Sequence, residues 1–306
     1  MDNSKRLDFL KKTFIEAGFA LSDSQAEAFL TYYDLLVEKN QVMNLTAITE
    51  FEEVVVKHFL DSCMAGKYLF PAKSGSQRVE PQESETETLR MEAETFGAEE
   101  PSRALRVIDV GTGAGFPGVP LKILISDMKL VLLDALQKRI GFLDEVVRAC
   151  GLKDVETVHG RAEEMVKSVA PETSRSKASE TGRSKAAEAA HSQREREKGC
   201  GAEEESFREG FDIALSRAVA YLPVLLEYCL PFVKVGGYFI AYKSGEIEEE
   251  LKASQNALET LGGTLERTEA FTLPDESKRT LLFIRKTQET PDKYPRRSKK
   301  IEKDPL

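Results

Sequence analysis

The sequence predicts an α/β fold: a mostly parallel sheet with an antiparallel hairpin at its edge, preceded by an N-terminal helical cap. Three observations support this fold class. Apolar residues recur at helical spacing over residues 7–64, short β-branched runs then alternate with helical segments, and a glycine-rich turn directly follows the first of these runs. Alternating strands and helices imply a parallel sheet that helices cover on both faces.

Residues 1–66 are expected to form the helical cap. Residues 9–19 and 26–39 carry apolar side chains three and four positions apart, and the pattern from Ser22 to Gln25 is a capping box. Asn44 is expected in a turn. His58 and Asp61 fall one helical turn apart, so they form either a polar pair that faces a ligand pocket or an internal hydrogen bond.

The α/β domain is expected over residues 105–286. Short apolar runs bounded by turn residues predict its strands, and amphipathic stretches predict its helices. The expected strands span 106–110, 129–133, 155–159, 211–215, 238–242, 265–272 and 279–285, and the expected helices begin near 119 and span 137–150, 221–230 and 246–261. A short loop joins the last two strands, which predicts the antiparallel edge hairpin.

Two low-complexity segments interrupt this pattern. The linker over 67–104 contains one at 73–102, and the α/β domain contains the other at 169–209. Both are rich in Glu, Ser, Lys, Arg and Ala and poor in aromatic residues. Such segments bury too little apolar surface to offset the entropy lost on ordering, so we expect both to be disordered insertions.

Charge is distributed unevenly along the chain. The formal net charge of −9 alone argues against a nucleic-acid partner. Residues 287–306, however, form a basic C-terminal tail that either binds phosphate or is simply solvated. Its cations are Lys293, Arg296, Arg297, Lys299, Lys300 and Lys303.

The apolar stretches and the cysteines of the sequence indicate where the protein acts and whether it holds a metal. The N-terminus lacks a long apolar region, and no stretch approaches the roughly 18 apolar residues of a membrane span, so we expect a cytoplasmic protein without membrane contact. Cys63, Cys150 and Cys229 are expected in the core, and Cys200 lies in a low-complexity segment. Their wide spacing predicts no metal site.

The strongest candidate for a binding site is the turn after the first strand. The strand ends in Asp109, and Gly111, Gly113 and Gly115 follow at alternate positions, where they allow close approach of a ligand to the backbone. Asp109 can offer its carboxylate to a cation or a ligand amine. A dinucleotide fingerprint would need a third glycine where Phe116 stands, so a pyrophosphate cradle is disfavoured.

A second acid supports a nucleoside ligand. Asp134 ends the second strand, about 20 residues after the glycines, which is the distance at which an acid binds ribose hydroxyls. A ligand with a ribose and a positively charged amino-acid tail fits two acids beside a glycine turn. S-adenosyl-L-methionine (SAM) is such a ligand, and each acid alone would be equally compatible with a helix cap.

Further candidates follow the later strands, because ligands of open α/β sheets bind at the carboxyl ends of strands. Ala162 and Glu163 follow the third strand, where an adenine ring would lie, although Glu163 could equally be an acid favoured by the helix dipole. Arg217 follows the fourth strand and would position the methyl acceptor. Lys243 is a secondary candidate for contact with phosphate.

The absence of certain sequence motifs limits the classes of methyl acceptor. No N-P-P-Y-like motif follows the fourth strand, and no strand ends in a Pro-Cys or Thr-Cys pair, which disfavours methylation of amino nitrogens and of pyrimidine carbon 5. An acceptor that is already nucleophilic remains. Guanine N7 fits, because its lone pair is exposed in the major groove and attacks without losing a proton. Such a site needs positioning rather than a general base.

At these residues the chain resembles the RsmG family, also called GidB, which are bacterial SAM-dependent enzymes that methylate guanine N7 in the 530 loop of 16S ribosomal RNA. The motifs that carry the resemblance are NLTAI at 44–48, KHFLDS at 57–62, VIDVGTGAGFPG at 107–118, LLDALQKR at 132–139, GRAEE at 160–164, LSRA at 215–218 and YKSG at 242–245. It covers the chain except the two low-complexity segments, and the tail resembles the basic tail of Gram-positive members only in part.

The resemblance implies a Rossmann-like, class I SAM-methyltransferase fold. It also implies that Gly111, Phe116, Ala162, Glu163 and Arg217 contact SAM or line its pocket. The implied substrate is 16S rRNA, the small ribosomal subunit or its assembly intermediate, and we expect a monomer. The alternatives are a SAM methyltransferase with a protein or small-molecule acceptor, a non-catalytic RNA- or ribosome-binding module and, more distantly, a nicotinamide dehydrogenase.

Overall fold

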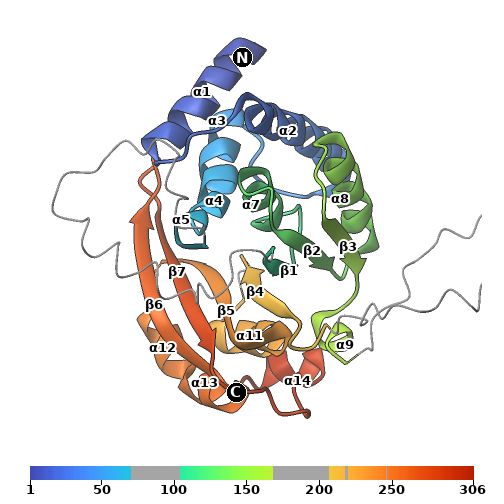
Figure 1. The fold of residues 1–306 in the computed structure, drawn as a ribbon, viewed down its shortest axis with the longest axis vertical. Helices are drawn as coiled ribbons and strands as arrows, with labels where there is room; N and C mark the ends of the chain where they lie inside the picture. The colour runs from blue at the N-terminus through green and yellow to red at the C-terminus, as the bar shows by residue number, and fades with distance from the viewer. Residues whose placement is uncertain (70–103, 168–206, 218–219, 246) are drawn as a thin grey trace, which may run out of the picture.

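The computed structural model describes residues 1–69, 104–167, 207–217, 220–245 and 247–306 (Figure 1). The low-complexity segment predicted at 73–102 lies outside these residues, as does most of the one predicted at 169–209. That second segment was extended too far, because Phe207 is buried and packs edge-on against Phe211. Phe207, which ends the charged stretch, therefore belongs to the core of the domain.

The described strands form one sheet in the order β3-β2-β1-β4-β5-β7-β6. The first five strands are parallel, and β7 pairs antiparallel with both β5 and β6. The strands are β1 (Arg106–Val110), β2 (Lys129–Asp134), β3 (Val155–His159), β4 (Phe211–Ser216), β5 (Val233–Ser244), β6 (Gly263–Thr272) and β7 (Lys278–Lys286). The predicted fold class, with its antiparallel edge hairpin, is confirmed.

Helices cover both faces of the sheet (Figure 1). Alternate residues of β1 enter different cores: Val107 packs with the cap, α7 and α8, whereas Ile108 packs with α11 and α13. This alternation is the period of an extended strand buried on both sides. The covering helices are α7 (Gly118–Leu124), α8 (Gln137–Ala149), α9 (Ala162–Met165), α11 (Leu222–Cys229), α12 (Glu248–Ala253), α13 (Gln255–Leu261) and α14 (Ser298–Lys303).

The helix expected over 246–261 is divided at Ser254. The Ser254 hydroxyl donates to the Glu250 carbonyl at 2.6 Å, while its backbone N–H bonds to Leu251 instead. A serine that competes for the carbonyl four residues earlier bends or ends a helix. Two short helices, α12 and α13, result, and residue 246 lies outside the described chain.

The cap is helical, as predicted. Its capping box at Ser22 and Gln25 is present, and Asn44 ends the long helix in a left-handed conformation with φ 50°. The cap contains α1 (Asn3–Glu16), α2 (Asp23–Met43), α3 (Phe51–Val54), a π-helix (Val55–Leu60), α4 (Asp61–Cys63) and α5 (Gly66–Leu69). No helix in the described part of the chain is long and apolar enough to cross a bilayer.

A chain of aromatic rings joins the cap to the sheet. The ring centroids of Phe29 and Phe59 are 5.0 Å apart, those of Phe59 and Tyr32 are 5.3 Å apart, and those of Tyr32 and Phe116 are 5.5 Å apart. Phe116 belongs to the glycine turn after β1. The cap and the turn therefore share one core, and each fixes the position of the other.

Candidate functional site

The glycine turn between β1 and α7 is built for a close neighbour. Gly111 and Gly113 have φ of +71° and +64°, and a Cβ on either would meet no protein atom within 4 Å. Gly115 differs, because a Cβ there would lie 2.7 Å from the Tyr32 hydroxyl. The first two glycines thus border open space that a ligand can use, whereas packing against the cap explains the third.

Asp109 closes this turn from beneath. Its Oδ2 accepts hydrogen bonds from the Thr112 hydroxyl at 2.7 Å and the Gly118 N–H at 2.8 Å. Its Oδ1 is buried and has no hydrogen-bond partner in the described part of the chain. Burial raises the pKa of Asp109 to about 6, and the two hydrogen bonds reduce that rise. Oδ1 is therefore the atom that remains for a ligand donor.

Asp134 is buried at the end of β2 and holds the turn in place. Its Oδ2 accepts from the Gly113 N–H at 3.0 Å and lies 3.1 Å from the Arg139 guanidinium, while Oδ1 accepts from the Leu136 N–H at 2.9 Å. Ribose hydroxyls at this carboxylate would share it with Arg139. Gly160, at the end of β3, donates to the Asp134 carbonyl, which brings Ala162 and Glu163 of α9 to the same edge of the sheet.

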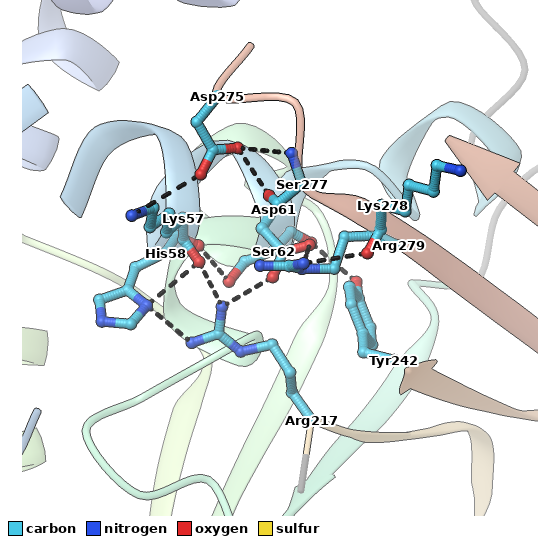
Figure 2. Close-up of polar contacts among 10 residues, drawn as sticks. All are labelled: Lys57, His58, Asp61, Ser62, Arg217, Tyr242, Asp275, Ser277, Lys278 and Arg279. Atoms are coloured by element: carbon cyan, nitrogen blue, oxygen red, sulfur yellow. Dashed lines mark hydrogen bonds and ion pairs between the residues drawn. The ribbon is translucent and has the colours of Figure 1, made fainter. Parts of the chain in front are cut away.

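Arg217, directly after β4, is the centre of a polar network (Figure 2). Its guanidinium donates to the Lys57 carbonyl and to Asp61 Oδ2, both at 3.1 Å. It also lies 4.8 Å from the ring centroid of Phe116, within the range of a cation–π contact. These contacts fix the arginine between the cap and the glycine turn.

Asp61 lies between two arginines. Oδ2 bonds to Arg217, and Oδ1 is 3.6 Å from Arg279 Nε, at the start of β7. Burial raises the pKa of the Asp61 carboxyl, and the two guanidinium groups limit the rise. The carboxylate thus neutralises part of a doubly cationic cluster and fixes its geometry.

His58 faces the same network. Its Nδ1 lies 3.3 Å from an Arg217 nitrogen, its Nε2 lies 2.8 Å from the Thr46 hydroxyl, and its ring stacks on Phe116 with centroids 4.6 Å apart. Nδ1 also lies 3.2 Å from the Lys57 carbonyl, so it faces both a guanidinium, which only donates, and a carbonyl, which only accepts. Burial, followed by the charge of Arg217, lowers the pKa of His58 to about 3. His58 and Asp61 therefore both contact Arg217, and among the described residues no side-chain hydrogen bond joins the two to each other.

Lys243 has a different environment from the one expected. Its side chain is buried, with Nζ 2.6 Å from Glu250 Oε2 and 2.9 Å from the Ala220 carbonyl. Glu250 also accepts from the Leu222 N–H at the start of α11. These contacts tie β5 to the segment after Arg217, and they argue against a direct role for Lys243 in contacting phosphate.

Three residues of the site were not singled out from the sequence. Tyr32 donates its hydroxyl to the Ala114 carbonyl inside the glycine turn, Tyr242 donates to the Ser62 carbonyl at 2.7 Å, and Arg279 approaches Asp61. Tyr242 lies in the YKSG motif, and the available signal for Tyr32 is a hydroxyl group at an apolar position of a helical pattern. Nothing local distinguished Arg279. Among the described residues, no group of His, Cys, Asp or Glu is arranged to hold a metal ion.

Comparisons with known sequences identify one family. A family model described as rRNA small subunit methyltransferase G matches residues 25–77, 93–192 and 197–281. The match extends into both low-complexity segments, so the resemblance reaches further than the sequence motifs indicated.

Individual relatives carry the same name. Proteins named ribosomal RNA small subunit methyltransferase G from Alkaliphilus metalliredigens and Lachnoclostridium phytofermentans are 43% and 42% identical to this chain. The alignments cover 97% and 96%, respectively, of both partners. Among solved structures, M. jannaschii TYW2 in complex with AdoMet matches 68% of this chain and 78% of its own, with 14% identity and a TM-score of 0.40.

Proposed function

The chain belongs to the rRNA small subunit methyltransferase G family, and we propose that it transfers the methyl group of SAM to N7 of a guanine in the 530 loop of 16S rRNA. Membership makes it a SAM-dependent enzyme that acts on small-subunit ribosomal RNA. The observation that carries the finer proposal is the Arg217 network beside an open glycine turn, in which no described residue is a free base. We also infer that the enzyme acts in the cytoplasm as a monomer, on 16S rRNA, the small subunit or an assembly intermediate.

The residues around the turn fit SAM. The space beside Gly111 and Gly113 admits a ligand against the backbone, and Asp109 Oδ1 lacks a protein partner. We assign Asp134 to the ribose, and Ala162 and Glu163 to the adenine. Phe116 and Arg217 line the side that faces the acceptor. When bound, SAM supplies a sulfonium methyl group that a nucleophile attacks directly.

Among the described residues, the acceptor side holds no base that is free to act. His58 is hydrogen-bonded at both ring nitrogens, and Asp61 is held by two guanidinium groups. Guanine N7 attacks through its lone pair without losing a proton, so the chain needs only to orient the base. We assign that task to Arg217, whose direction Asp61, His58 and Phe116 determine.

The proposal is tested by methyl transfer to purified small subunits, followed by cleavage chemistry specific for 7-methylguanine. We expect one modified guanine in the 530 loop. Because misplacement of about 1 Å costs about 100-fold in rate, Arg217→Ala is expected to lower kcat/KM by at least about 100-fold. Arg217→Lys retains the charge but not the planar fork, and it is expected to recover little. Transfer to another base atom, or full activity of Arg217→Ala, would overturn the proposal.

A further inference from the structure

The C-terminal segment, residues 287–306, lies beyond the range matched by the family model and is docked on the domain. Tyr294 and Ile301 are buried, and α14 lies against α11 (Figure 1). Arg208 donates to the Thr290 and Tyr294 carbonyls, and the Thr290 N–H donates to Glu209 at 2.7 Å. The basic segment is therefore held in a defined place on the surface.

One of its cations performs the docking. Glu227 of α11 is fully buried and accepts four hydrogen bonds from Arg296, one from the backbone N–H and three from the guanidinium, at 2.6–3.1 Å. A buried carboxylate requires such a partner, because desolvation without one costs several kcal/mol. Arg296 is thus an anchor, and its charge is not available to another molecule.

The cations that follow Arg296 are exposed. Ile301 faces the protein, and Lys299 and Lys303, two positions before and after it, lie on the opposite side of the helix. They are four residues apart, a spacing at which like charges cost a helix a few tenths of a kcal/mol. Arg297, just before the helix, is exposed as well. No ion pair joins these three cations to an acid in the described part of the chain, whereas Lys300 pairs with Asp304.

The helix that carries this surface shares a neighbour with the proposed cofactor site. Both α14 and α9, the helix that begins with Ala162 and Glu163, pack against α11 (Figure 1). Tyr228 of α11 connects them: burial and the carboxylates of Glu163 and Glu302 raise the pKa of Tyr228 to about 12. Glu302 of α14 and Glu163 of α9 therefore both lie near this tyrosine.

We propose that Arg297, Lys299 and Lys303 bind backbone phosphates of the ribosomal RNA substrate, and that the Arg296–Glu227 pair holds this surface beside the site. The inference rests on the proposed function, because it takes the substrate to be RNA. A chain with net charge −9 repels a polyanion at long range, so binding depends on local cations. These three exposed cations have no acidic partner among the described residues, and phosphates would also relieve the repulsion between Lys299 and Lys303.

The test compares the triple variant Arg297→Gln, Lys299→Gln, Lys303→Gln with the wild type in methyl transfer to small subunits at 50 and 200 mM salt. Each phosphate contact contributes about 0.7–0.9 to the slope of log affinity against log salt. Loss of three contacts should make the wild-type KM rise about 20- to 40-fold more than the variant KM over this range. We expect kcat and SAM affinity to remain unchanged.

A matched control removes the same charge elsewhere. Lys12→Gln, Lys129→Gln and Lys153→Gln alter three exposed lysines, two of which lie near the amino-terminal ends of strands, away from the proposed site. An unchanged slope in the α14 variant, or an equal change in the control, would overturn the surface while leaving the proposed function intact. Absence of methyl transfer by the wild type would instead refute the proposed function.

Discussion

The pH dependence of stability tests whether His58 is held neutral against Arg217. Burial and the guanidinium lower its pKa to about 3 in the folded protein, from an ordinary value of 6.5. The unfolded chain therefore takes up a proton below pH 6.5 that the folded protein refuses. Stability contributed at this position is present above pH 6.5 and is lost as pH falls toward 3.

The magnitude follows from the two pKa values. Between pH 7 and pH 5 the unfolded histidine becomes almost fully charged while the folded one remains neutral, which costs about 2 kcal/mol. This free-energy change hardly depends on the pKa of His58 in the folded protein, because a pKa of about 3 or 4 lies below the range from pH 5 to pH 7. Asp109 works in the opposite direction, since its raised pKa of about 6 favours the folded protein as pH falls.

The assay compares urea unfolding of the wild type and His58→Asn at pH 7 and pH 5. Both proteins carry Asp109, so its effect cancels in the difference. Relative to the wild type, the variant should gain about 2 kcal/mol between the two pH values. His159→Asn, at an exposed histidine in β3, is the matched control. If wild type and His58→Asn change in parallel, His58 is not held neutral and our account of Arg217 is wrong.

Three further predictions concern the turn, the docked segment and a low-complexity segment. Gly113→Val should abolish SAM binding measured by calorimetry, whereas Gly151→Val, at an equally open glycine with positive φ, should only lower stability; equal SAM affinity in both would contradict the site. Arg296→Ala strands the buried Glu227 carboxylate and should cost about 3–5 kcal/mol in urea unfolding, and a loss below about 1 kcal/mol would contradict the anchor. Deletion of residues 174–203 should leave Tm and SAM affinity nearly unchanged, because that composition cannot form a core; cooperative loss of folding would refute this.

Local sequence predicts the elements of this fold well, because each signal depends on neighbours in the chain. The strand over 155–159 and the capping box at Ser22 are examples, and both are confirmed. The break at Ser254 was missed because serine also occurs inside continuous helices, so the residue type alone does not predict that its hydroxyl will bond the carbonyl four residues earlier. The buried Phe207 was missed because one aromatic residue hardly changes the composition of a charged segment.

The candidate site also contains one part that local sequence predicts and one part that it does not. The turn at 111–116 is specified by consecutive residues, and the sequence placed it after a strand, where it lies. The charge network is specified by residues far apart in the chain, with Asp61 in the cap, Arg217 after β4 and Arg279 in β7. Only the order of the strands brings the third of these beside the first. The sequence could therefore suggest that Asp61 makes a polar contact, but it could not identify Arg217 and Arg279 as the two partners.

The structure also shows that the helical cap is part of the candidate site. A helical segment before an α/β domain could be an independent module, yet Tyr32 donates to the backbone of the glycine turn and His58 stacks on Phe116 within it. The same π-helix leads into Asp61, which orients Arg217. The cap therefore supplies both the packing that shapes the turn and the carboxylate that directs the arginine. A change in the cap core that moves Phe59 would reach the acceptor side through these contacts, without altering any residue proposed to contact SAM or RNA.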